Sequence, residues 1–171
     1  MLVMGGAALT WGLVVGCEVL TRRMSPLANK VEAFAREGPG ATKLEVTVYA
    51  LEPRLNELAG DEDPNHQLAQ VTAAHFHQYP ILKAQAVSDA ALAKEVVRGV
   101  VEGMRRRASG YKCFDPRHGL RITRGGEHVD LVICYECELV EVWGLGGALL
   151  GEYHTTSGSS RRVMEKALGG R

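Results

Sequence analysis

Apolar and polar residues alternate along several stretches of the chain, and this alternation predicts strands. It is clearest between Lys43 and Leu51, where every second residue from Leu44 onward is apolar. Because successive side chains of a strand point to opposite faces, such a segment buries one face and exposes the other. Further strands are predicted at 81–87, 119–123, 129–143 with an interruption, and 148–155.

A period of about four residues replaces the alternation from Asp89 to about Arg107, and it predicts the longest helix. Ser88 stands at the expected N-cap, and arginines occupy the last turn, where cations interact favourably with the helix dipole. Shorter helices are predicted at 26–36 and after Ser160. The apolar stripe of the long helix consists of Leu92, Val96, Val100 and Met104.

The order of the elements between residues 43 and 171 is strand, strand, helix, three strands, helix. Adjacent strands with segregated helices are typical of the α+β class. We therefore predict an antiparallel sheet of about five strands, with the long helix and a short C-terminal helix packed on one face. An apolar N-terminal helix is expected to precede this domain.

A two-residue turn signal, Gly125-Gly126, lies between two alternating segments and predicts a β-hairpin. A hairpin centred there sets Arg121 opposite Asp130 and Arg124 opposite Glu127, so that charges of opposite sign are paired. The same register pairs apolar residues with each other, Ile122 with Val129 and Leu120 with Leu131.

The overall composition is that of an ordinary globular protein, with 46% hydrophobic residues and twenty Lys and Arg against twenty Asp and Glu. A net charge of zero argues against a protein that coats nucleic acid and against a disordered acidic tail. The basic residues at 105–124 have acidic neighbours across the predicted hairpin. Nucleic acid is therefore not an expected partner.

The first 20 residues form an apolar segment with a single charge, Glu18, and Arg22-Arg23 follow it. Such a run is typical of an export signal or a membrane anchor. Val14-Val15-Gly16-Cys17 resembles a relaxed bacterial lipobox, in which Cys17 would be lipidated and hold an exported protein at a membrane surface. The alternatives are a single transmembrane helix with a cytoplasmic domain, which the basic pair favours, and a buried helix of the fold itself.

The chain is expected to have three parts. Residues 1–20 are a signal peptide, a lipoprotein signal or a membrane anchor, and residues 21–40 are a short helix and a linker. The linker ends at the breaker cluster Gly38-Pro39-Gly40. Residues 41–171 form a single α+β domain, which is membrane-anchored in the cell envelope if the lipoprotein interpretation holds.

Thiols and one imidazole are expected to converge at one end of the predicted hairpin. Extension of its register past Gly119 brings the segment that precedes it beside the end of the partner strand, and neighbouring strands lie about 4.8 Å apart. A bulge or knuckle at Tyr135-Glu136 is required to turn both thiols of the CxxC sequence to one side. The expected cluster comprises Cys113, His118, Cys134 and Cys137.

Several chemistries fit this cluster. Three thiolates and an imidazole are a tetrahedral zinc set whose closed shell would be structural, whereas two of the thiols would form a disulfide in an oxidising compartment. Thioredoxin-type exchange is less favoured, because β-forming residues flank the CxxC sequence on both sides. A Cys113/His118 nucleophile pair has no identifiable orienting acid or oxyanion site. Metal and disulfide both remain open, and no catalytic residue is assigned.

His75 and His77 are secondary candidates for a metal pair. They are two residues apart and would share one face of a strand. Histidines in this position are more often exposed, or hydrogen-bonded in a loop, than bound to a metal.

Four segments resemble motifs of a family of uncharacterised bacterial proteins. Members are small, exported and often lipoprotein-like, with CFxPRHG followed by DLxICFEC. The resemblance covers about residues 43–168, with Tyr135 in place of the usual Phe. It implies an envelope location and a single cysteine cluster, and it implies no activity. The segments are YALEP at 49–53, FHQYPIL at 76–82, CFDPRHG at 113–119 and DLVICYEC at 130–137.

The sequence as a whole predicts a membrane-anchored envelope domain with a structural or redox Cys/His cluster and a binding or structural role. The alternative is a zinc-binding Cys3His module, or a thiol-dependent enzyme, that uses the same cluster. Zinc is the one cofactor that these residues suggest, and the protein partner or small ligand is not specified.

Overall fold

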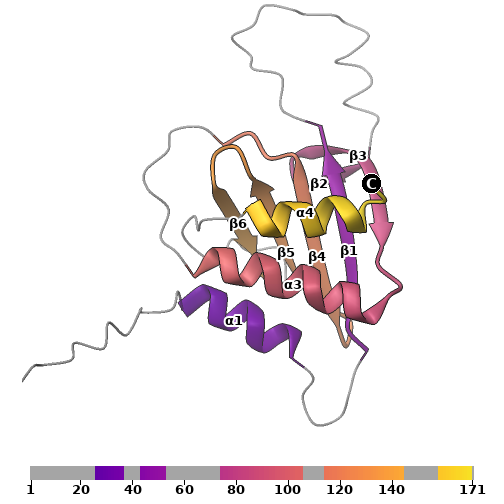
Figure 1. Cartoon of the computed structure of the whole chain (residues 1–171), viewed down its shortest axis with the longest axis vertical. Helices are drawn as coiled ribbons and strands as arrows, with labels where there is room; N and C mark the ends of the chain where they lie inside the picture. The colour runs from indigo at the N-terminus through magenta and orange to yellow at the C-terminus, as the bar shows by residue number, and fades with distance from the viewer. Residues whose placement is uncertain (1–25, 37–42, 53–73, 106–113, 145–157, 171) are drawn as a thin grey trace, which may run out of the picture.

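The computed structural model describes residues 26–36, 43–52, 74–105, 114–144 and 158–170. These residues form an antiparallel sheet and a layer of helices packed against it (Figure 1). The α+β class and the antiparallel sheet that the sequence predicts are therefore confirmed.

The described part of the sheet has six strands, because a short strand precedes the second expected one and the strand predicted at 129–143 is divided in two at its interruption. Their order across the sheet is β2-β3-β1-β4-β5-β6, and every neighbouring pair is antiparallel. β1 therefore lies between two strands that are distant from it in sequence. The strands are β1 (Glu45–Leu51), β2 (His75–Phe76), β3 (Tyr79–Ala86), β4 (His118–Arg124), β5 (Glu127–Cys134) and β6 (Leu139–Trp143).

The β4–β5 hairpin has the register that the sequence predicts. Arg121 pairs with Asp130, and Arg124 pairs with Glu127. The turn is made by Gly125 and Gly126, with φ of 58° and 87°. Glycine adopts this left-handed conformation without the steric cost that a side chain brings, so the sequence and the turn agree.

Three helices, α1 (Pro26–Ala35), α3 (Ala90–Met104) and α4 (Gly158–Ala167), lie on one face of the sheet (Figure 1). The N-cap of α3 is Asp89, whereas Ser88 is the N-cap predicted from the sequence. The Asp89 carboxylate accepts hydrogen bonds from the backbone N–H groups of Ala91 and Leu92 at 2.8 and 2.9 Å, which satisfies two otherwise unpaired donors.

The main hydrophobic core lies between the sheet and this layer of helices. Alternate residues of the central strands point into it, and α3 contributes the apolar stripe predicted from the sequence, of which Leu92 is only partly buried. Its most deeply buried members include Val48, Leu120, Ile122, Leu131, Ile133, Val96, Val100, Met104 and Met164.

Helix α1 is part of this packed domain, although the sequence analysis places it before the domain, with a linker. Leu27, Ala28 and Val31 are buried in the main core, and the helix packs on α3. The apolar face of α1 therefore packs into the core of the domain. The apolar segment 1–20 and the strand predicted at 148–155 lie outside the described residues.

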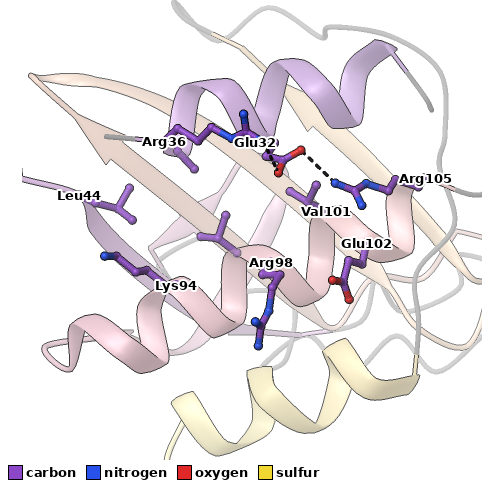
Figure 2. A pocket seen from close by; sticks show the side chains of 10 residues that line it. Glu32, Arg36, Leu44, Lys94, Arg98, Val101, Glu102 and Arg105 are labelled. Atoms are coloured by element: carbon purple, nitrogen blue, oxygen red, sulfur yellow. Dashed lines mark hydrogen bonds and ion pairs between the residues drawn. The ribbon is translucent and has the colours of Figure 1, made fainter. Parts of the chain in front are cut away.

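A pocket of about 380 Å³ opens between α1, α3 and the start of β1 (Figure 2). Its floor is made by the sides of the two helices that face each other above the core. Charged side chains from both helices surround it, as the labelled residues in Figure 2 show.

Candidate functional site

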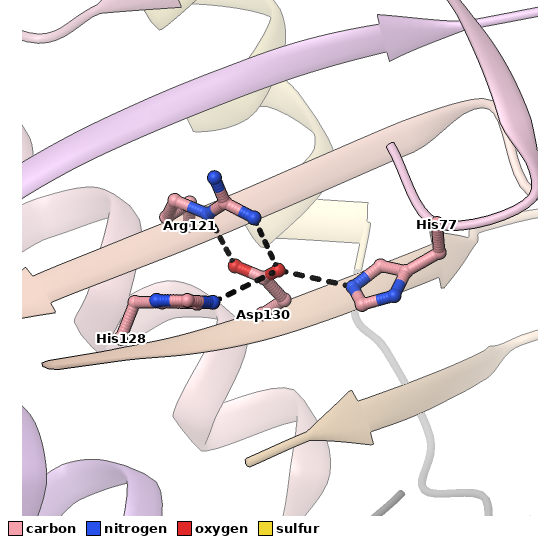
Figure 3. Close-up of polar contacts among 4 residues, drawn as sticks. All are labelled: His77, Arg121, His128 and Asp130. Atoms are coloured by element: carbon pink, nitrogen blue, oxygen red, sulfur yellow. Dashed lines mark hydrogen bonds and ion pairs between the residues drawn. The ribbon is translucent and has the colours of Figure 1, made fainter. Parts of the chain in front are cut away.

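The sheet face opposite the helices carries a cluster of ionisable side chains. We call it the Asp130 site, and it comprises His77, Arg121, His128 and Asp130 (Figure 3). Asp130 lies at its centre, with only 2% of the side chain exposed, whereas the Arg121 and His128 side chains are 38% and 37% exposed. A buried carboxylate is thus surrounded by groups that reach the surface.

Asp130 binds its neighbours through both carboxylate oxygens. The Arg121 guanidinium donates from Nε to Oδ1 at 2.8 Å and from Nη2 to Oδ2 at 2.7 Å. His77 Nε2 lies 3.0 Å from Oδ2, and His128 Nε2 lies 3.8 Å from the same oxygen. Because an ionised carboxylate only accepts hydrogen bonds, the proton of the His77 contact belongs on Nε2.

The β4–β5 register positions two of these residues. Arg121 and Asp130 are directly paired across the hairpin, so their side chains leave the same face. His128 lies two residues before Asp130 on β5 and therefore shares that face. The hairpin alone thus positions three of the four residues of the site.

His77 reaches the site from the tip of the β2–β3 hairpin. It occupies the turn between these strands with φ of 57°, a left-handed conformation that is uncommon for a residue with a side chain. The hairpin tip lies over the sheet, because Phe76 stacks on Tyr49 of β1 with ring centroids 4.3 Å apart. This placement brings the His77 imidazole onto Asp130, which lies on β5.

Aromatic rings frame the site. The His77 ring stacks on Trp143 of β6 at 4.5 Å with an angle of 22° between the planes, and the Arg121 guanidinium lies 5.6 Å from the centre of the Phe76 ring. These contacts restrict both side chains to the geometry that Asp130 favours. Arg121 and His77 are therefore each held by a carboxylate and by a ring.

The carboxylate also stabilises the charged form of Arg121. The hydrogen bond to Asp130 raises the pKa of Arg121 above its usual value, and the burial of Tyr49 raises the pKa of its phenol. Arg121 therefore remains protonated and balances the charge of Asp130. A guanidinium has five N–H groups, and Asp130 takes two of them, which leaves three for other acceptors.

The two described cysteines lie at the end of the β4–β5 hairpin, where the sequence predicts them. Cys134 and Cys137 are buried free thiols, and Phe114 packs against them. The backbone N–H of Cys137 donates to Cys134 Sγ at 3.1 Å across a turn, and Glu138 at its end has φ of 53°. This turn is the knuckle that the sequence analysis requires at Tyr135-Glu136.

His118 lies on the other side of the sheet from Cys134. It pairs with Ile133, and the next residue along β5 points to the opposite face. Its ring meets Tyr135 edge to face at 5.0 Å, toward α4. Burial lowers the pKa of His118, so its imidazole is neutral over a wider pH range than a free histidine.

Only some of the other predicted site residues lie in the described part of the chain. Cys17 and Cys113 lie outside the described residues, so the expected four-residue cluster is not tested. His75 is exposed on β2, whereas the partner of His77 is Asp130 and not His75. The predicted hairpin register pairs Arg121 with Asp130, but no site is predicted there. An aspartate within the apolar strand VDLVIC was the available signal, because buried carboxylates need partners.

Within the described ranges, no three His, Cys, Asp or Glu side chains form a group that could hold a metal ion. At the Asp130 site a physical reason is evident, since the guanidinium of Arg121 already neutralises the carboxylate. None of the helices described by the structure has both the length and the apolar character needed to cross a membrane. Comparisons with protein families, curated proteins and solved structures give no match.

Proposed function

We propose that the protein is a membrane-anchored, non-enzymatic domain of the cell envelope that binds an anionic group of its ligand through the Asp130 site. The observation that carries this proposal is the fixed guanidinium of Arg121. Asp130 and Phe76 hold it in one orientation, and its side chain is still 38% exposed. A preorganised guanidinium is a suitable donor for carboxylate or phosphate oxygens.

One neighbouring imidazole favours the same ligand chemistry. His128 is 37% exposed beside Asp130, whereas His77, 17% exposed on the other side of the same carboxylate, uses its Nε2–H for Asp130 (Figure 3). Because Arg121 and Asp130 cancel each other's charge, an anion meets the remaining N–H donors of Arg121 without a net repulsive field. Asp130 acts as a positioning group, since both of its oxygens are occupied.

The anchoring part of the proposal rests on the N-terminal sequence. The apolar segment 1–20 and the pair Arg22-Arg23 precede α1, which begins at Pro26 and packs into the domain. The domain would therefore lie close to the membrane surface. The favoured form is an exported lipoprotein anchored through Cys17, and a single transmembrane helix with a cytoplasmic domain is the alternative.

Calorimetric titration of the full chain with inorganic phosphate tests this function. We expect saturable binding to the wild type, weakened about tenfold in His128→Asn, because a hydrogen bond to a charged group is lost. His75→Asn is the matched control, since it removes an exposed histidine outside the site. No saturable binding of phosphate, or equal weakening in the two variants, would contradict the proposed anion site.

The cysteine pair supports a second candidate function, metal binding. Cys134 and Cys137 lie on one CxxC turn, which the N–H···S hydrogen bond from Cys137 to Cys134 closes, and cysteine sulfur is a preferred ligand of a soft metal. Phe114, which packs on the pair, directly follows Cys113 in the sequence. We propose that Cys113, Cys134 and Cys137 supply three thiolates to one zinc ion, and that His118, on the other face, is not the fourth ligand.

The intact mass of the chain, measured without reductant under native and then denaturing conditions, tests the metal candidate. We expect one bound zinc that is released on denaturation, and its loss in Cys137→Ser. His118→Gln is expected to retain the metal, because this side chain packs against Tyr135. A chain without metal whose mass is two protons lower would instead identify a disulfide.

A further inference from the structure

The outer surface of the helix layer carries mostly positive charge. Helix α3 lies between α1 and α4 and packs on both of them (Figure 1). The residues of each helix that point away from the core are exposed. Of the charged residues exposed on this layer in the described chain, six are cations and one, Glu102, is an acid. The cations are Lys30 of α1, Arg36 directly after it, Lys94 and Arg98 of α3, and Arg162 and Lys166 of α4.

Helical spacing and packing join these cations into one surface. On α3, Lys94, Arg98 and Glu102 follow each other at intervals of four residues, and side chains four apart share one side of a helix. Arg162 and Lys166 are spaced in the same way on α4. Arg98 and Lys166 line one hollow between the two helices, and Figure 2 shows Arg98 extended toward α4. We call the surface formed by the six cations and Glu102 the basic face.

The partly buried acids of the helix layer do not cancel this charge. Glu32 accepts hydrogen bonds from Arg36 at 2.9 Å and from Arg105, which directly follows α3, at 3.0 Å. Glu165 accepts one from Arg161 at 2.8 Å. With the partly buried side chains included, the described part of the layer holds eight cations and four acids, which is an excess of four positive charges.

The remainder of the described chain has the opposite charge. It holds five cations and nine acids, which is an excess of four negative charges, so the described residues are neutral as a whole. Charge is therefore segregated between the two layers of the domain, with the helices positive and the sheet and its connections negative. A charged surface orients a molecule with such a distribution.

Apolar contact contributes little to the basic face. Among the residues that the structure describes, the one large hydrophobic side chain that is exposed is Leu82, and it belongs to β3. A partner of the basic face is therefore selected by its negative charge and not by an apolar surface.

We propose that the basic face docks on the headgroups of an anionic phospholipid bilayer, an inference that rests on the membrane anchoring proposed above. Chain order favours this partner, because the apolar segment 1–20 and Arg22-Arg23 precede α1, which carries Lys30. The anchor is thus joined to the layer that holds the basic face. Cations that come within the Debye length of an anionic surface, about 8 Å at physiological ionic strength, are attracted to it.

Docking in this orientation leaves the Asp130 site accessible. His77 and Asp130 lie on the face of the sheet opposite the helices, and this face would point away from the bilayer. A ligand from the aqueous phase would then reach Arg121 while the domain is docked. The lipid surface and the ligand of the Asp130 site therefore do not compete.

Paramagnetic relaxation enhancement tests the orientation, with the full chain in lipid nanodiscs that contain a gadolinium-chelating lipid. The measured quantity is the enhancement at the backbone amides of α3 and α4 divided by that at the His77 amide. We expect this ratio to exceed one in nanodiscs of roughly one third phosphatidylglycerol in phosphatidylcholine, because the helices then lie nearer to the lipid. In nanodiscs of phosphatidylcholine alone we expect the ratio to be at least about threefold lower, since no surface charge orients the domain.

Two double variants with the same change in total charge test the basic face itself. Arg98→Glu combined with Arg162→Glu reverses two of its cations, and we expect the ratio in anionic nanodiscs to fall to the value for neutral ones. Lys43→Glu combined with Arg117→Glu is the matched control, because both residues are exposed cations outside the basic face. We expect this control to keep the ratio within about twofold of the wild type. Circular dichroism of each variant verifies that the domain is folded.

The docking proposal is overturned if the ratio is the same in anionic and neutral nanodiscs, if His77 shows the larger enhancement, or if the two double variants have equal effects. Flotation of the full chain with vesicles separates these results from a failure of the anchor. A chain that floats with phosphatidylcholine vesicles but is not oriented in anionic nanodiscs is anchored and not docked. A chain that floats only with phosphatidylglycerol vesicles docks without an anchor, and a chain that floats with neither contradicts both proposals.

Discussion

Replacement of Asp130 by alanine is expected to lower the free energy of unfolding by about 3 kcal/mol, the lower end of the range for a broken buried ion pair. The substitution leaves the guanidinium of Arg121 without its two hydrogen-bond acceptors and removes the partner of His77. Because the Arg121 side chain is 38% exposed, water recovers part of this loss. Urea denaturation of the full chain measures the change.

Two further variants separate the ion pair from other effects of the substitution. Glu127→Ala removes an exposed acid from the same strand, and we expect it to cost less than about 1 kcal/mol. Asp130→Leu combined with Arg121→Leu is expected to be more stable than Asp130→Leu alone, because no unpaired charge remains. Equal costs for Asp130→Ala and Glu127→Ala would contradict the geometry of the Asp130 site.

Replacement of Gly119 by alanine is expected to lower the free energy of unfolding by about 2 kcal/mol, as overpacking of a dense region does. A Cβ atom at this position would lie 2.7 Å from two ring carbons of Phe76 and 3.3 Å from Cβ of Tyr49. The Phe76 ring has little room to move, because it is stacked on Tyr49. The substitution should also displace His77, which follows Phe76 in the hairpin.

Gly158→Ala is the control for this effect, because an added Cβ at that position meets no atom within 4 Å. We expect its stability to remain within about 1 kcal/mol of the wild type. In a Phe76→Ala background, Gly119→Ala should cost much less than it does alone. Additive costs in this double-mutant cycle would show that the ring does not lie on Gly119.

The β4–β5 hairpin could be predicted in detail because its determinants are local. Gly125 and Gly126 specify the turn, and the pairing of Arg121 with Asp130 follows from it by counting. The charged pair lies within an otherwise apolar strand, and this contrast carries the information about register. Local pattern therefore predicted a central part of the sheet and the core of the Asp130 site.

The contribution of His77 could not be predicted in the same way. It reaches Asp130 because the β2–β3 hairpin lies over the sheet, where Phe76 contacts both Tyr49 and Gly119. These contacts join β2 to strands that are distant in sequence, and periodicity contains no information about such pairings. From the sequence alone, His77 is therefore predicted to pair with His75 and not with Asp130.

At the cysteine cluster, the predicted register does not show to which face of the sheet each side chain points. The predicted register places His118 near the thiols, but His118 and Cys134 leave opposite faces of the sheet. Similarly, Ser88 and Asp89 are both good N-cap residues, and only the backbone geometry distinguishes them. In both cases the sequence indicates the right type of residue, but it does not specify the direction in which the side chain points.

The most direct test of the proposed function is an NMR titration of the full chain, in nonionic detergent, with inorganic phosphate. The signals to follow are the arginine Nε–H groups and the histidine ring nitrogens. Binding at the Asp130 site predicts that the signals of Arg121, His128 and His77 shift together and saturate at one concentration, while those of Arg98 and His75 stay in place. Shifts confined to other arginines, or no saturable shift at Arg121, would contradict the assignment of this site.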